Sequence, residues 1–384
     1  MADDDQNDAQ PPAPVRTGTG TREIDELLNV LFQEGGSDLH MKVGTAPTFR
    51  IDGVLARLEG EEPVTDEELE RALHTMMPPG RWENFLERNE ADFAYTLEDI
   101  GRFRINAFRQ RGAITFVCRL VRVGSPSFED LGLPPVIRQL SEEPRGLILV
   151  TGPTGSGKTT TLAAMIDHIN SSKAVHILTI EDPIEVLHPD REATVNQREV
   201  GVDTDSFHTA MRAAMRQDPD VILVGEMRDP ETVQAALAAA ETGHLVLSTL
   251  HTIDATETVN RIVDFFPAFQ QQQIRVALAG ALKGILCQRL MPRADGGRVP
   301  AVEVMINTGR TADLIADPLR TAGIQDLIRE GEFYGMQTFD QSLLALVLGG
   351  PVLIPDALDA ASNRHDFQLN LEQAGIDVKQ HIGA

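Results

Sequence analysis

Eight consecutive residues, from Gly152 to Thr159, have the spacing G-x-x-x-x-G-K-[ST]. The apolar run GLILVT precedes them and apolar residues at helical spacing follow, as in a loop between a buried strand and a helix. Glycines let backbone N–H groups surround phosphate oxygens, the lysine reaches the β and γ phosphates, and the hydroxyl is a ligand for Mg²⁺. We therefore predict a loop that binds ATP and Mg²⁺. Its predicted nucleotide-binding residues are Gly152, Pro153, Thr154, Gly155, Ser156, Gly157, Lys158, Thr159 and Thr160, with Thr159 on the metal.

A second apolar run, VILV, is followed by Gly225 and Glu226. The carboxyl ends of parallel strands meet at one sheet edge, so Glu226 is expected beside the phosphate loop, where it can orient or deprotonate water. Many P-loop enzymes hold Mg²⁺ through an aspartate at the position of Gly225, so here the metal would depend on Thr159, phosphate oxygens and water. A solvated glutamate at a strand end is the alternative reading of Glu226.

Two further strands are expected to end at the same edge. The run HILTI is followed by Glu181, Asp182 and Glu185. Glu185 fits two interpretations equally well: it positions a metal ion or water indirectly, or it only belongs to a turn around a proline. LVLSTL ends at His251, whose imidazole can sense the γ-phosphate by hydrogen bonding. His244 starts that run, so sheet geometry places it at the opposite edge.

These strands alternate with helical segments from residue 136 to residue 371, which predicts an α/β domain with a doubly wound parallel sheet. After Pro267 we expect a helix that includes Ile274, Leu278, Leu282 and Ile285, and then a hairpin that turns at residues 295–297. From about Ala312 the chain is expected to be mainly helical.

Residues 21–123 are predicted to form a smaller α+β domain. It should contain a helix from Ile24, a hairpin at Asp52-Gly53, a helix over residues 66–77, and two long strands that turn near Arg111-Gly112. Residues 124–135, rich in glycine, proline and serine, are expected to be a linker. Tails are expected at residues 1–20, which are predicted to be disordered, and at residues 372–384.

Composition restricts the possible functions. A chain of 384 residues is long enough for two domains, and its formal charge of −24 argues against a nucleic-acid groove, which needs a basic surface. The two cysteines, Cys118 and Cys287, lie in apolar stretches and are expected to be buried thiols in a reducing cytoplasm. The first residues have neither the cationic nor the apolar part of a signal peptide, and no apolar run approaches the length of a membrane span, so we expect no direct membrane insertion.

Several of these segments together resemble one family, the PilT-type pilus retraction ATPases of the hexameric secretion superfamily (GspE/PilT family). The resemblance is carried by SDLHMKVGTAPTFRIDG, GRFRINAFRQRG, the phosphate loop, ILTIEDPIE, DPDVILVGEMRD, GHLVLSTLHT and GMQTFDQSL. It implies a RecA-like P-loop NTPase domain behind a PAS-like N-terminal domain, in an ATP-driven homohexamer. It also implies that Glu226 is the catalytic glutamate, that His244 and His251 form a histidine box, and that Arg104 and Arg109 reach the nucleotide.

The function that this resemblance implies is an ATPase motor for type IV pilus retraction and twitching motility. Its implied partners are an inner-membrane platform protein (PilC-like) and a second retraction ATPase, reached from the cytoplasmic face of the membrane. The chain departs from the family motif AIRNLIRE, because Gln325 and Asp326 stand where the arginine and asparagine are usual. A PilU-like accessory role or a secretion-system ATPase is therefore the alternative, ahead of a RecA-like nucleic-acid motor or a nucleotide-gated regulator without turnover.

Overall fold

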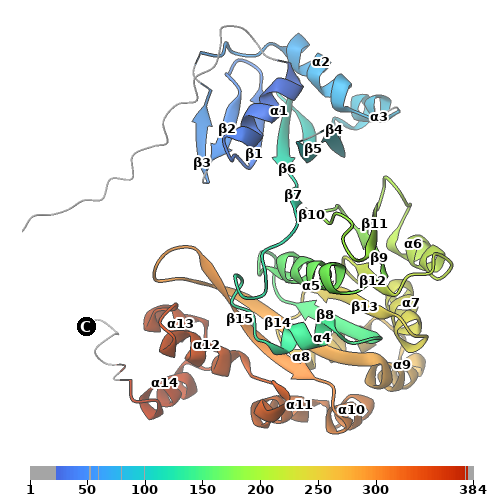
Figure 1. Ribbon diagram of the computed structural model, residues 1–384, viewed down its shortest axis with the longest axis vertical. Helices are drawn as coiled ribbons and strands as arrows, with labels where there is room; N and C mark the ends of the chain where they lie inside the picture. The colour runs from blue at the N-terminus through green and yellow to red at the C-terminus, as the bar shows by residue number, and fades with distance from the viewer. Residues whose placement is uncertain are drawn as a thin grey trace, which may run out of the picture. The chain divides into compact units, whose positions relative to one another are not determined.

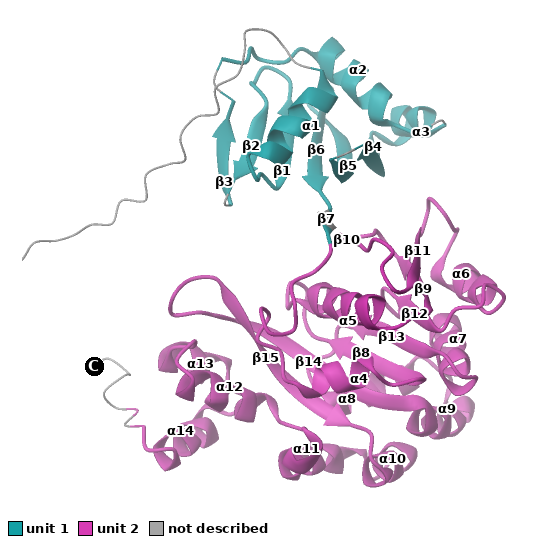
Figure 2. Cartoon of the chain, in the orientation of Figure 1, with its two compact units in different colours: residues 1–123 teal, residues 124–384 magenta. Residues whose placement is uncertain are grey.

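The computed structural model describes residues 23–51, 53–58, 60–78, 80–98, 100–376 and 378. The chain divides into two compact units at Val123 and Gly124, coloured separately in Figure 2. Figure 1 labels the elements of both units in chain order. The expected tail at residues 1–20 and Asp52 of the expected hairpin lie outside the described residues.

Unit 1 is an antiparallel sheet with three helices among its described residues. The sheet has the strand order β3-β2-β1-β6-β5-β4. Its core includes Leu27, Phe49, Phe103 and Phe116, none of them more than 1% exposed. The elements of unit 1 are α1 (Ile24–Gln33), β1 (Asp38–Lys42), β2 (Thr48–Ile51), β3 (Val54–Arg57), α2 (Asp66–Met76), α3 (Arg81–Arg88), β4 (Glu90–Leu97), β5 (Gly101–Gln110), β6 (Ala113–Leu120) and β7 (Arg122–Val123).

Unit 2 contains the parallel sheet. The strand order is β11-β9-β12-β13-β8-β14-β15, and every neighbouring pair is parallel except β14 and β15. The strand that ends before His251 is therefore central. The strands of unit 2 are β8 (Gly146–Thr151), β9 (His176–Glu181), β10 (Val186–Leu187), β11 (Thr194–Glu199), β12 (Val221–Val224), β13 (Leu245–Leu250), β14 (Leu282–Pro292) and β15 (Arg298–Ile306).

Helices cover both faces of this sheet. Successive side chains of a strand point to opposite faces, and in the buried strands both sets are apolar, so each face needs a covering layer. On one face Ile148 and Val150 pack against α4 and α5, and on the other Leu147 and Leu149 belong to the core shared with α7, α8 and α9. The helices of unit 2 are α4 (Val136–Ser141), α5 (Lys158–Ser172), α6 (Phe207–Ala214), α7 (Pro230–Glu241), α8 (Ala255–Asp264), α9 (Ala268–Ala281), α10 (Gly309–Ala316), α11 (Ile324–Glu330), α12 (Phe339–Leu348), α13 (Ile354–Ala360) and α14 (Arg364–Gln373), with 3-10 turns η1 (Thr321–Gly323) and η2 (Glu332–Tyr334).

The predicted α/β fold with a smaller N-terminal α+β unit is confirmed, and the predicted extent of the helix after Pro267 is wrong. The helix after Pro267 ends at Ala281, whereas Leu282 and Ile285 belong to β14. The spacing of these apolar residues fits a helix, but β14 is inserted beside β8 and is buried on both faces, which requires an apolar run of its own. The hairpin turn at residues 295–297 is found between β14 and β15, and β15 gives the sheet an antiparallel edge.

The C-terminal helices pack on the outer part of the β14–β15 hairpin. Their core includes Phe339, Phe367 and Leu371 together with Met291 and Val299 of the hairpin. Contrary to the expected tail from residue 372, α14 continues to Gln373, and beyond it Ile376 and Val378 join the same core. The sequence alone shows no apolar partner for Ile376 and Val378, so they were assigned to the tail. The hairpin and the C-terminal helices provide that partner.

Both cysteines are free and buried, as predicted. In the part of the chain that the structure describes, no helix has both the length and the apolar character that crossing a membrane requires.

Candidate functional site

The loop from Gly152 to Thr159 connects β8 to α5. Its backbone depends on glycine at two positions that face β14: a methyl group on Gly152 would lie 2.3 Å from the carbonyl oxygen of Gln288, and one on Gly157 would lie 2.7 Å from Gln288 Nε2. Gln288 is held in place by Thr161, whose hydroxyl donates to Oε1 at 2.8 Å. The loop is therefore seated against β14, and Gly157 at the N-cap of α5 leaves the N–H groups of the first turn for a ligand.

Lys158 lies inside this loop. Its Nζ donates to the carbonyl oxygens of Gly152 at 2.8 Å and Pro153 at 3.0 Å. Burial lowers the pKa of Lys158, and the nearby Glu185 partly offsets this. Ser156 Oγ is buried and has no hydrogen-bond partner among the described residues. A cationic amine, an unsatisfied hydroxyl and free helix N–H groups make this loop a fit for a phosphate group.

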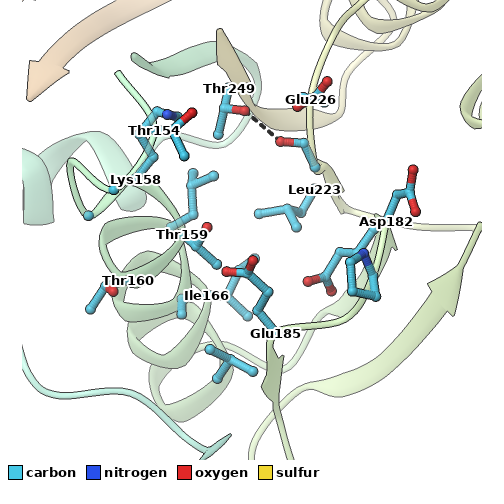
Figure 3. Close-up of a pocket in the computed structure, with 18 of the residues that line it drawn as sticks. Thr154, Lys158, Thr159, Thr160, Ile166, Asp182, Glu185, Leu223, Glu226 and Thr249 are labelled. Carbon is cyan, nitrogen blue, oxygen red and sulfur yellow. Dashed lines mark hydrogen bonds between the residues drawn. The ribbon is translucent and has the colours of Figure 1, made fainter. Parts of the chain in front are cut away.

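Glu226 and His251 lie together at the ends of β12 and β13. Thr249 Oγ1 donates to Gly225 O at 2.7 Å, which ties the two strand ends together, as the dashed line in Figure 3 shows. His251 Nε2 is 3.4 Å from Glu226 Oε2, and Arg228 forms an ion pair with the other oxygen of Glu226. Burial, followed by Lys158 and Arg228, lowers the pKa of His251, so the imidazole is neutral at pH 7 and can share a proton with Glu226.

The loop after β9 supplies the acidic side of the site. In Figure 3 the Glu185 carboxylate is turned toward Thr159. Glu181 is only 8% exposed and accepts hydrogen bonds from Thr179 Oγ1 at 2.6 Å and Gln197 Nε2 at 3.1 Å. Burial raises the pKa of Glu181. Glu181 is thus part of the wall, whereas Asp182 and Glu185 are exposed carboxylates of this loop, and Glu185 is the one turned toward Thr159.

One cavity of about 460 Å³ joins these groups. Its lining includes Thr154, Gly155, Gly157, Lys158, Thr159, Thr160, Glu181, Asp182, Glu185, Glu226 and His251. The cavity lies at the carboxyl ends of β8, β9, β12 and β13, where ligands bind in parallel sheets. The structure therefore brings together the residues that the strand ends predicted, and their chemical roles stay predictions.

His244 does not belong to this group. It precedes β13 at the opposite sheet edge, and its Nδ1 is 2.9 Å from the carbonyl oxygen of Ala239 and 3.4 Å from Thr242 Oγ1. These contacts let His244 close the end of α7, which is a structural role. Its assignment to the catalytic residues came from the resemblance alone, and the position of the strand contradicts a direct role in this cavity.

Arg104 and Arg109 lie on β5 of unit 1. Arg104 is 3.7 Å from Asp92 in an ion pair between exposed side chains. Arg109 donates to Gly112 O at 2.8 Å, and its guanidinium lies 5.6 Å from the centre of the Phe85 ring. Their predicted contact with nucleotide stays a prediction.

Sequence reasoning missed three residues around the loop. Gln288 supports the glycines, while Leu290 and Arg298, from β14 and β15, line the cavity. The hairpin is more than 120 residues away from the phosphate loop in sequence, so no local motif connects them. The sequence feature that could have indicated Arg298 is its position immediately after the predicted turn at residues 295–297.

A metal would have few protein ligands here. Among the described residues there is no group of three or more histidine, cysteine, aspartate or glutamate side chains that could hold a metal ion. The Thr159 hydroxyl and the Glu185 carboxylate suit Mg²⁺, which keeps several waters and binds through few protein oxygens together with substrate phosphates.

Comparisons with known proteins agree with this geometry. A family described as "Type II/IV secretion system protein" matches residues 18–304. The chain is 43% identical to the type IV pilus retraction ATPase PilT of Pseudomonas aeruginosa, over 90% of this chain and 100% of that protein. It is 39% identical to the type IV pilus ATPase PilU of the same organism, over 94% of each. A crystal structure of the pilus retraction motor PilT with bound ADP has a TM-score of 0.84, at 43% identity, and covers 91% of this chain and 100% of that one.

Proposed function

The chain belongs to the type II/IV secretion system protein family, and on that premise we propose that it is a motor ATPase that couples ATP hydrolysis to the retraction of type IV pili. Its relatives include a pilus retraction ATPase that is similar along its entire length, and the related motor structure contains ADP. The observation that supports this function best is the single cavity that contains Lys158, Thr159, Glu226 and His251.

Each of these side chains has a chemical task in hydrolysis. Lys158 exchanges the carbonyl oxygens of Gly152 and Pro153 for phosphate oxygens, which are stronger acceptors for an ammonium group. Glu226 orients the attacking water and accepts its proton. His251 hydrogen-bonds to Glu226. Through this contact, a change in the protonation of the Glu226 carboxylate affects the turn that follows β13.

Mg²⁺ would be held by Thr159, with Glu185 acting through water, and would supply neutralisation of phosphate charge. The fit rests on the exposed Glu185 carboxylate, which faces Thr159. Gly225 offers the metal no side chain, so Mg²⁺ would depend on Thr159, phosphate oxygens and water, and the task of Glu226, beside His251, is to act on water.

We further propose a homohexamer in which Arg104 and Arg109 reach a nucleotide. An arginine that neutralises developing phosphate charge links hydrolysis to the movement of the unit that carries it. The hexamer would act on an inner-membrane platform protein (PilC-like) of the pilus machine, from the cytoplasmic side. Purified protein should then have a hexameric mass, and Arg104→Ala and Arg109→Ala should lower kcat without loss of that mass.

The test of the enzymatic step compares the ATPase rates of the wild type, Glu226→Gln and Glu241→Gln. Glu241 is an exposed glutamate at the last position of α7, so its substitution is the matched control. We expect Glu226→Gln to lower kcat by about 100-fold or more with nucleotide affinity retained, and Glu241→Gln to have no effect. If the wild type binds ATP and does not hydrolyse it, the motor function is wrong and a nucleotide-gated regulator remains. Turnover that rises strongly with added DNA would favour a nucleic-acid motor instead.

An accessory role beside another retraction ATPase is the second candidate. It is favoured by the 39% identity to PilU over 94% of the chain and by Gln325 and Asp326 in the AIRNLIRE-like stretch. Pilus retraction in cells that lack this protein separates the two. Complete loss of retraction indicates the main motor, whereas retraction with reduced force or frequency indicates the accessory role.

A further inference from the structure

His251 stands at the start of a short turn between β13 and α8. Its side chain is 55% exposed, and Glu226 is its contact in the cavity. Packing therefore restrains the imidazole little. The direction of the side chain depends on where the backbone of residues 251–254 is held.

The backbone of this turn is tied to the first turns of α8. Thr252 and Thr258 share a hydrogen bond of 2.6 Å, and Ile253 N donates to Glu257 Oε2 at 2.9 Å. Asp254 is the N-cap: its Oδ1 accepts from Glu257 N at 2.7 Å, and its carbonyl oxygen accepts from Thr258 Oγ1 at 2.7 Å. Since each residue after His251 is bonded to α8, the turn moves with the N-terminus of that helix.

The N-terminus of α8 is in turn held by a buried carboxylate from β15. Glu303 is 4% exposed and accepts a hydrogen bond of 2.9 Å from Ala255 N, the first residue of α8. A carboxylate at a helix N-terminus is stabilised by the N–H dipoles, and more strongly when it is buried. In the sheet, Glu303 pairs with Cys287, and Cys287 pairs with Thr151, the last residue before the phosphate loop. Glu303 thus holds the N-terminus of α8 at the position along the sheet where β8 ends and the phosphate loop begins.

The second support of Glu303 comes from the C-terminal helices. Gln325 on α11 donates to Glu303 Oε1 at 3.4 Å. Helix α11 also packs against α8 and β15. Gln325 therefore connects the C-terminal part of the chain to the carboxylate that holds α8.

Burying the Glu303 carboxylate costs desolvation free energy. Burial, the largest effect, and the charge of Asp254 raise the pKa of Glu303. The hydrogen bonds from Ala255 N–H, Gln325 and Cys287 lower it, and the net shift is upward. An apolar residue at this position would avoid the desolvation cost but would leave Ala255 N–H unsatisfied. The gain from Glu303 is a defined position for α8 rather than stability.

We propose that Glu303, supported by Gln325, is a positioning residue that sets where His251 stands relative to Glu226. This rests on the proposed role of His251 in ATP hydrolysis. Through Gln325, the position of α11 is coupled to the catalytic edge of the sheet, so the C-terminal helices adjust kcat without touching the nucleotide.

The experiment is a double-mutant cycle on kcat for ATP hydrolysis by the full-length chain. Gln325→Leu is measured in the wild type and in the His251→Asn background, with the KM for ATP and the thermal midpoint recorded for each protein. Asp326→Asn is the matched control, because Asp326 is exposed on the same helix and pairs only weakly, at 3.3 Å, with the exposed Arg329. Glu303→Gln keeps an acceptor oxygen for Ala255 N–H, and Glu303→Leu removes it.

Gln325→Leu is expected to lower kcat about fivefold with KM and thermal midpoint unchanged, and to have less than about a twofold effect once His251 is asparagine. Glu303→Leu should lower kcat about tenfold or more, and Glu303→Gln should stay within about twofold of the wild type. If Glu303→Leu does not fold, the Gln325 cycle alone decides.

An unchanged kcat in Gln325→Leu, or the same fivefold loss in both backgrounds, overturns the proposal, because a purely structural effect does not depend on His251. A wild-type kcat in His251→Asn overturns it as well. A wild type without turnover is a different outcome, since it removes the proposed function itself.

Discussion

Replacing Gly152 with alanine should destabilise unit 2 far more than the same change at Gly155, three residues away in the same loop. At Gly152, φ is +142° and the added methyl carbon would meet the Gln288 carbonyl oxygen at 2.3 Å and Ser156 Oγ at 2.6 Å. At Gly155, φ is +78° and nothing lies within 4 Å. The pair therefore separates backbone strain, which both share, from the contacts with Gln288 of β14 and with Ser156, which only Gly152 has.

The magnitudes follow from these two terms. Backbone strain at Gly152 costs about 2 kcal/mol and the overlap with Gln288 and Ser156 about 2 kcal/mol more, a total of about 4 kcal/mol. Gly155→Ala has the left-handed strain alone, about 1.5 kcal/mol. For a unit of this size, 1 kcal/mol corresponds to about 2–4 °C, so the two variants should differ in thermal midpoint by roughly 7 °C.

Differential scanning calorimetry without nucleotide measures this difference directly, because no ligand then contacts either methyl group. The wild type is the reference for both variants. If Gly152→Ala and Gly155→Ala unfold within about 1 °C of one another, β14 does not hold the phosphate loop and the reasoning from the Gln288 contact is refuted.

Three further predictions concern the cavity. Since burial, Lys158 and Arg228 hold the pKa of His251 below its ordinary value of 6.5, kcat/KM should fall only at pH values below 6.5. A pH profile of His251→Asn that keeps this fall would assign it to another group. Burial raises the pKa of Glu181, so the folded state binds this proton more tightly than the unfolded chain and stability is lost as pH rises above the ordinary value of 4.5. Glu181→Gln should therefore raise the thermal midpoint, relative to the wild type, more at pH 8 than at pH 5, and equal shifts at both pH values would contradict this. Arg298→Gln should raise the KM for ATP about tenfold with kcat unchanged, as expected for one charge-assisted contact, and steady-state kinetics that show a lower kcat instead would give Arg298 another role.

The residues of the cavity that follow buried strands could be predicted from the sequence. A run of four to six apolar residues between turn residues indicates a buried strand, and in a parallel sheet the residues after the run lie at the ligand edge. This holds for Glu226 and His251, whereas Lys158 was predicted from the spacing of the phosphate loop. The same argument placed His244 at the far edge, where the structure has it, although the resemblance had assigned it to catalysis.

The tertiary structure alone decided what surrounds these residues. Leu282 and Ile285 fit helical spacing, and only pairing with β8 makes them part of a strand. Once β14 and β15 lie beside the phosphate loop, Gln288 supports its glycines, and Glu303 reaches the helix that follows His251. Local sequence indicates most of the strands of the parallel sheet and the residues that end them, because a strand buried on both faces needs a short apolar run. It does not determine which distant strands become neighbours, because that depends on packing energies summed over the whole sheet.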